Sequence, residues 1–137
     1  MGDVLVEIIL KNGGDLVRVR DGHITEENIR SVTVTALVDT GARTLVINED
    51  LRKKLGLAVV NEFHATLAGG SKVSCNVTEP VQIYWNGRTS SVQAWVLPDE
   101  EDTLLGVIPL EEMDLMVDPS NRKLVGAHGD IMTGRIK

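Results

Sequence analysis

One short segment of the chain combines a carboxylate, a hydroxyl and a glycine directly after an apolar run. The apolar residues 36–38 lead into Asp39, Thr40 and Gly41. A carboxylate at the end of a buried strand is poorly hydrated, which suits it to exchange a proton near neutral pH. Thr40 adds a hydroxyl beside it, and Gly41 allows a sharp turn and the close approach of another chain. The segment is a candidate acid–base site, and the same residues also suit an ordinary turn that closes a strand.

Strand-like patterns surround this segment and must position it. Residues 31–38 alternate, with Val32, Val34, Ala36 and Val38 on one face. Glycine-containing turns at Gly69-Gly70 and Asn86-Gly87 predict two hairpins. Aliphatic and β-branched runs predict the remaining strands, at residues 4–10, 16–20, 45–47, 81–85, 92–97, 115–117 and 123–125.

Helix signals are few. Asn48 is a suitable N-cap, acidic residues fill the first turn after it, basic residues the last, and Gly56 follows. A second, single turn is expected at Pro109. The sequence therefore predicts an all-β fold with one or two short helices. We expect one domain over residues 1–126 and a loose tail over residues 127–137, which are polar and contain glycine.

Length, charge and cysteine content exclude several classes of protein. A chain of 137 residues with 42% hydrophobic residues is long enough for one core. Its net charge of −6 is spread along the chain, which disfavours binding to nucleic acid or to an anionic membrane. No basic leader and no apolar run of about 18 residues is present. Cys75 is the one cysteine, which favours a reducing compartment, so we expect a cytoplasmic protein.

Three features in a fixed order carry a resemblance to a known family. They are an Asp-Thr-Gly-Ala sequence at residues 39–42, a glycine-tipped hairpin at 69–70 and a Leu-Leu-Gly sequence at 104–106. Together with their neighbours they resemble the retroviral-type, single-domain aspartic proteases, and most closely the bacterial relatives of those enzymes. The resemblance extends over residues 4–125 and implies a retropepsin-like closed β-barrel.

The resemblance also implies a role for each residue of the first sequence. Asp39 is implied to be catalytic. Thr40 is implied to hydrogen-bond across a dimer beneath two aspartates, and Gly41 to contact the substrate backbone. Ala42 completes the set of residues that support the active site.

Two further segments take roles in the same way. The hairpin around Gly69 and Gly70 is similar to the flap of these proteases, although the residues alone also suit a plain hairpin turn. Leu105 and Gly106 are implied to cross behind the active-site loop. The chain departs from the retroviral pattern at Arg43, where an acidic residue is usual, and at Val107, where an arginine is usual. The ion pair of those two positions is therefore missing, and the segment before Ser31 is longer than in the retroviral form.

The chemistry of such a protease requires a second copy of this chain. It needs two carboxylates about 3 Å apart that share one proton. The sequence has one Asp-Thr-Gly, and the other Asp-Thr, at Asp102, continues with leucine too near the chain end to head a second lobe. We therefore expect a homodimer with Asp39 beside its twofold axis.

The remaining polar and aromatic residues favour structural interpretations. The three histidines lie far apart and no metal site or cofactor is expected. Cys75 is expected to be a half-buried thiol, and Trp85 and Trp95 to pack within a hairpin. The acidic stretches at 99–102 and 111–112 are expected to be solvated, with steering of basic substrates as the alternative.

The leading hypothesis is a homodimeric aspartic endopeptidase that binds an extended peptide or protein substrate. Ala42, Leu45 and Ile108 are candidates for its side-chain pockets because they adjoin the motifs. A peptide- or partner-binding dimer that does not cleave is the second hypothesis, and a purely structural dimer is the third.

Overall fold

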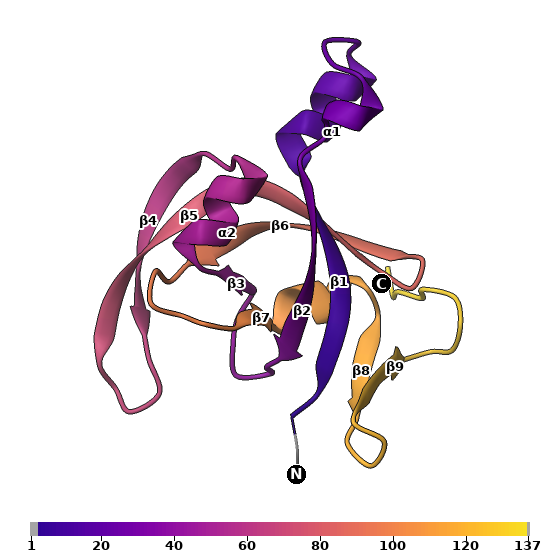
Figure 1. Cartoon of the computed structure of the whole chain (residues 1–137). Helices are drawn as coiled ribbons and strands as arrows, with labels where there is room; N and C mark the ends of the chain where they lie inside the picture. The colour runs from indigo at the N-terminus through magenta and orange to yellow at the C-terminus, as the bar shows by residue number, and fades with distance from the viewer. Residues whose placement is uncertain (1–2, 137) are drawn as a thin grey trace.

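Six strands of this chain close into a barrel around one apolar core (Figure 1). The computed structural model describes residues 3–136. Its strands are β1 (Leu5–Asn12), β2 (Ser31–Val38), β3 (Leu45–Ile47), β4 (Val59–Thr66), β5 (Lys72–Trp85), β6 (Arg88–Val96), β7 (Thr103–Leu105), β8 (Leu115–Asp118) and β9 (Lys123–Gly126). The barrel order is β1-β2-β7-β3-β6-β5, and pairing of β1 with β5 closes it. The predicted all-β, retropepsin-like barrel is confirmed.

Alternation along the strands builds the core. In β1, Val6, Ile8 and Leu10 point inward and are buried, while Leu5 and Ile9 point outward. Strand β6 alternates in the same way. The inward side chains of β1, β5 and β6 meet Leu45, Ile47 and Leu105 from the short strands β3 and β7, so these two strands of the barrel also contribute side chains to the core.

Both predicted hairpins are present. Strands β4 and β5 are joined through Gly69 and Gly70, and β5 and β6 through Asn86 and Gly87. Only β5 belongs to the barrel in the first hairpin, because β4 pairs with β5 alone. The β4–β5 hairpin therefore extends beyond the barrel, at the lower left of Figure 1.

The predicted helix after Asn48 is confirmed as α2 (Glu49–Leu55). The Asn48 side chain accepts a hydrogen bond from the amide of Leu51 at 2.9 Å. Gly56 ends the helix with a φ of 62°, a left-handed conformation that favours glycine. Leu51 and Leu55 face the core, so α2 covers one opening of the barrel.

The strand expected at residues 16–20 is wrong, because α1 (Gly13–Arg20) occupies this segment. Asn12 is fully buried, and its side chain accepts a hydrogen bond from the Asp15 amide at 3.0 Å while donating to the Leu55 carbonyl at 2.8 Å. This anchored N-cap starts a helix although the apolar residues that follow alternate as in a strand. Together with the 3-10 turn η1 (Glu26–Asn28), α1 projects from the barrel, at the top of Figure 1.

The C-terminal part of the chain packs beneath the barrel. The turn of helix expected at Pro109 is present as α3 (Val107–Glu112), which begins two residues before that proline. With α1, which was not expected, residues 3–136 contain three short α-helices. Strands β8 and β9 form a separate hairpin. The chain after β9 returns to Asp114, which precedes β8 and accepts hydrogen bonds from His128 and from the Thr133 amide. The division at residue 126 stays a prediction.

None of the helices among residues 3–136 has the length and apolar character needed to cross a membrane.

Candidate active site

The loop that carries Asp39 joins β2 to β3 and is held at both ends by β7. Val38 pairs with Leu105 in the parallel β2–β7 ladder, and Leu45 pairs with the same residue in the antiparallel β3–β7 ladder. The amide of Asp39 donates to the Leu105 carbonyl at 3.0 Å. Leu105 is fully buried. The start and the end of the loop are therefore fixed to one core residue.

The segment after Leu105 crosses directly behind the loop. The amides of Gly106, Val107 and Ile108 donate to the carbonyls of three loop residues, which are Thr44 at 3.1 Å, Ala42 at 2.9 Å and Arg43 at 2.9 Å. These carbonyls would otherwise need water or another partner. Strand β7 and the start of α3 thus hold the Asp39 loop in place through backbone hydrogen bonds. Leu105 and Gly106 were expected to cross behind this loop, and they lie in this segment.

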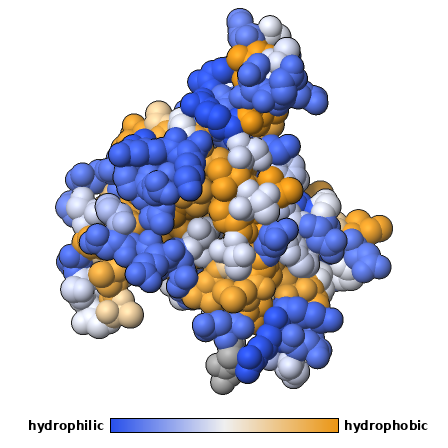
Figure 2. Space-filling view, in the orientation of Figure 1, coloured by the Kyte–Doolittle hydropathy of each residue, from blue (hydrophilic) through white to orange (hydrophobic). Residues whose placement is uncertain are grey.

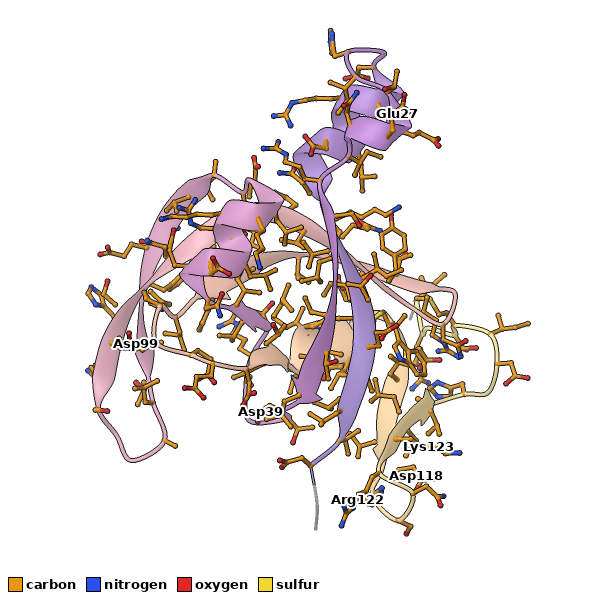
Figure 3. All side chains as sticks on the ribbon, viewed as in Figure 1. Glu27, Asp39, Asp99, Asp118, Arg122 and Lys123 are labelled. Carbon is orange, nitrogen blue, oxygen red and sulfur yellow. The ribbon has the colours of Figure 1, made fainter. Side chains whose placement is uncertain are left out.

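The side chain of Asp39 lies at one end of the barrel (Figure 3). It is partly exposed, and its Oδ1 accepts a hydrogen bond from the Gly41 amide at 2.9 Å. The Ala42 amide donates to the Asp39 carbonyl at 3.0 Å, which closes a tight turn around the exposed Thr40. Among residues 3–136, Asp39 shares no hydrogen bond with another carboxyl group. One copy therefore presents one carboxylate.

The glycine-tipped hairpin reaches toward the same end of the barrel as Asp39 (Figures 1 and 3). Gly69 and Gly70 have φ values of 93° and 90°, and nothing lies within 4 Å of where a side chain would begin. The Leu67 amide donates to the Ser71 carbonyl at 2.7 Å across the tip. The tip and Asp39 are not in hydrogen-bonding contact. The tip is therefore exposed and has the backbone freedom that its glycines provide.

A cavity of about 280 Å³ lies beside the Asp39 loop. Side chains from the loop, the hairpin, β6 and α3 line it: Arg43, Thr44, Phe63, Val77, Ser91, Val92, Gln93, Trp95, Ile108 and Glu112. Ile108 was an expected pocket residue and lines this one. Leu45 was also expected, and this is wrong, because Leu45 has no exposed surface and belongs to the core.

Sequence reasoning missed the aromatic part of this cavity. Phe63 and Trp95 stack with ring centroids 5.4 Å apart. Trp95 was expected to pack within its own hairpin, and it contacts a ring on β4 instead, while Trp85 packs against the core. Phe63 is the one phenylalanine of the chain, and its place between the charged Glu62 and the polar His64 was the available signal.

The environment of Cys75 is that of a structural residue. Cys75 is buried rather than half-buried, and burial raises the pKa of its thiol. Among residues 3–136, no three metal-binding side chains gather closely enough to hold an ion.

Comparison with known proteins agrees with this geometry. The family model described as aspartyl protease matches residues 25–107, which is more than half of the chain. The matched region includes the Asp39 loop, the β4–β5 hairpin and the crossing segment up to Val107. No curated protein matches the chain. The assignment to a bacterial branch stays a prediction. On the family match, supported by the closed barrel, this chain belongs to the retropepsin-like aspartyl protease family.

Proposed function

We propose that this protein is an aspartic endopeptidase that acts as a homodimer, with one Asp39 from each copy in a shared active site. The observation that carries the proposal is the Asp39 loop itself. A single carboxylate stands partly exposed at the barrel end, on a loop whose backbone is fixed by Leu105 and Gly106. Because the chain has one Asp-Thr-Gly, a second copy is the source of the second carboxylate.

An apolar surface near Asp39 supports the association of two copies. Figure 2 shows hydrophobic side chains over the middle and lower part of the face on which β1 lies. Leu5 is 59% exposed and pairs with Leu37, two residues before Asp39. Exposed apolar surface of this kind is typical of a protein–protein interface. A stable dimer buries more than about 1,000 Å² in total.

The reaction follows from two carboxyl groups that hold one proton between them. The ionised Asp39 takes a proton from water as the water oxygen bonds to the peptide carbonyl carbon. The protonated Asp39 of the other copy donates its proton to the carbonyl oxygen. When the tetrahedral intermediate collapses, the carboxyl group that took the water proton donates it to the leaving nitrogen and the carbon–nitrogen bond breaks. The ionised partner takes the proton of an intermediate hydroxyl as the new carboxyl group forms, so the pair again holds one proton.

The substrate of the proposed enzyme is a peptide or protein segment in an extended conformation. It lies between the Asp39 loops and the β4–β5 hairpins, which act as flaps through Gly69 and Gly70. An extended backbone suits recognition by strand-like hydrogen bonds, with alternate side chains entering pockets. A cytoplasmic location is part of the proposal and rests on the single cysteine, Cys75.

A mixing experiment tests the shared active site. Wild-type protein is incubated with an equal amount of an Asp39→Asn variant, and cleavage of a denatured protein is followed by mass spectrometry. Random exchange leaves about a quarter of the dimers with two aspartates, so activity per wild-type chain falls to about half. Unchanged activity per wild-type chain, with exchange verified by native mass spectrometry, contradicts a shared site. Binding of peptides without any cleavage by wild type would instead support a non-proteolytic binding dimer.

A further inference from the structure

We propose that the cavity beside the catalytic loop is a substrate subsite that takes an aromatic side chain, and that Arg43 selects an acidic residue two positions away in the same substrate. This inference rests on the proposed function, because it concerns the peptide that the Asp39 pair would cleave. It adds a sequence preference that the catalytic residues do not provide.

The cavity is continuous with the catalytic loop. Arg43 and Thr44 contribute to its lining and lie in the same loop as Asp39. The carbonyls of these two residues accept hydrogen bonds from Ile108 and Gly106, so their backbone position is fixed. Phe63, in the middle of β4, brings the β4–β5 hairpin into the lining of the cavity. A peptide held between loop and hairpin therefore passes this cavity.

The residues that line the cavity suit an aromatic side chain of a substrate. Phe63 is 45% exposed although it is stacked on Trp95, so part of the aromatic surface remains open. The floor is aliphatic, with Val77, Val92 and Ile108. Aromatic rings prefer offset stacked or edge-to-face contacts, which are favourable beyond the burial of area alone. A substrate phenylalanine, tyrosine or tryptophan therefore gains more here than an alanine.

The two charged residues that line the cavity, Arg43 and Glu112, differ in their side-chain contacts. Arg43 is exposed and forms no side-chain hydrogen bond or ion pair with any residue between 3 and 136. Glu112, the one acidic lining residue, accepts a hydrogen bond from the Ser90 hydroxyl. The guanidinium is thus available to a substrate carboxylate. Side chains two residues apart on an extended peptide share a face, so the aromatic and the acidic residue can reach the cavity together.

The charge preference is tested with paired peptides that differ only in one residue, Glu or Lys, two positions from a phenylalanine. With wild-type protein we expect a higher kcat/KM for the Glu peptide. Arg43→Glu should shift the Glu-to-Lys ratio roughly tenfold toward Lys. Lys53→Glu is the matched control, because Lys53 is exposed on α2, away from the cavity lining, and forms no ion pair within the described residues. It should leave the ratio unchanged.

The aromatic preference is tested at Phe63. Phe63→Ala should reduce the Phe-over-Ala preference of the substrate about fivefold, whereas Phe63→Tyr should retain it. Because Phe63 is partly exposed, both variants are expected to fold, which thermal melting checks. A preference that stays the same in Phe63→Ala overturns the aromatic half of the proposal, and an unchanged Glu-to-Lys ratio in Arg43→Glu overturns the other half.

A binding measurement separates failure of this subsite from failure of the proposed function. The same peptides are titrated into the Asp39→Asn variant, with and without Arg43→Glu, and tryptophan fluorescence is followed. Binding that depends on Arg43, without cleavage by wild type, keeps the subsite and contradicts the protease. Cleavage without the expected preferences supports the protease and contradicts the subsite. If no peptide is bound and none is cleaved, both the subsite and the proposed function are contradicted.

Discussion

Gly106 and Thr44 are joined backbone to backbone, with the Gly106 amide donating to the Thr44 carbonyl oxygen at 3.1 Å. A β-carbon at Gly106 would lie 2.4 Å from that oxygen and 2.5 Å from the Ala42 carbonyl oxygen. Contacts this short involve backbone atoms that are already hydrogen-bonded, so they cannot be relieved by a side-chain rotation. The crossing segment and the Asp39 loop can therefore approach this closely only because residue 106 is glycine.

Gly106→Ala is expected to destabilise the protein and to displace the Asp39 loop. Overpacking against fixed backbone costs about 2 kcal/mol or more, because either the loop or the crossing segment must move. The free energy of unfolding from urea titration and the rate of peptide cleavage should both fall. Gly134→Ala is the control, since nothing lies within 4 Å of a β-carbon there. Equal stability of Gly106→Ala and wild type would contradict the tight crossing.

Asp39→Asn is expected to abolish proteolysis and to leave the fold and the dimer intact. The amide is nearly isosteric with a protonated carboxyl group, but it cannot accept a proton from water. In the wild-type dimer two close carboxyl groups cannot both ionise readily, so activity should be bell-shaped in pH with an acidic optimum. Cleavage across a pH series, with circular dichroism and sedimentation of the variant, tests this. Cleavage at the wild-type rate would assign the activity to other residues or to a contaminant.

Gly69→Val and Gly70→Val are expected to slow turnover far more than they lower thermal stability. Both glycines have positive φ, which β-branched residues resist, while the open space around them leaves no steric clash with the barrel. The measurement is kcat and KM for one peptide together with Tm for each variant. If both variants cleave at the wild-type rate, the hairpin does not close over substrate and the flap assignment is wrong.

Asp15→Asn is expected to lower stability at neutral pH by about 2 kcal/mol. Asp15 is 2% exposed, and hydrogen bonds from Arg30 hold its pKa well below the ordinary value, against burial, which raises it. A carboxylate with a depressed pKa in the folded state stabilises the protein above its unfolded pKa, near 4. The gap between wild type and variant should therefore shrink as the pH falls below about 4.

Urea unfolding at several pH values between 2 and 7 measures this gap. Asp21→Asn is the control, because Asp21 forms only an exposed ion pair with Arg20, and such pairs contribute little. A gap that stays constant over this pH range would show that the ion pair with Arg30 does not stabilise the fold.

Turns and helix caps, which depend on a few neighbouring residues, could be predicted from the sequence. The hairpin turn at Asn86-Gly87, the cap at Asn48 and the stop at Gly56 act through a few neighbouring residues, so their effect does not depend on the rest of the fold. The Asp-Thr-Gly turn at residue 39 is of the same kind. The closed barrel also followed, although through resemblance to a family rather than from the alternation of the strands.

The segment after Asn12 shows where such local reasoning fails. Its apolar residues alternate as in a strand, yet it forms α1 because Asn12 is anchored to Leu55 and caps the helix. Gly13 also lies so close to the Pro80 carbonyl that a β-carbon would be 2.5 Å from that oxygen, and β1 ends there. These partners are more than 40 residues away, and no window of neighbouring sequence contains them.

By itself, the sequence of this protein determined local features: one Asp-Thr-Gly turn, from which a second copy was predicted, and a hairpin with two glycines at its tip. Only the tertiary structure decided what surrounds that carboxylate. Arg43, Phe63 and Trp95 come from a loop and two strands that are distant in the chain, and they meet because closure of the barrel and pairing of β4 with β5 bring them to one cavity. Local turns depend on adjacent residues, whereas a cavity depends on how all the elements pack.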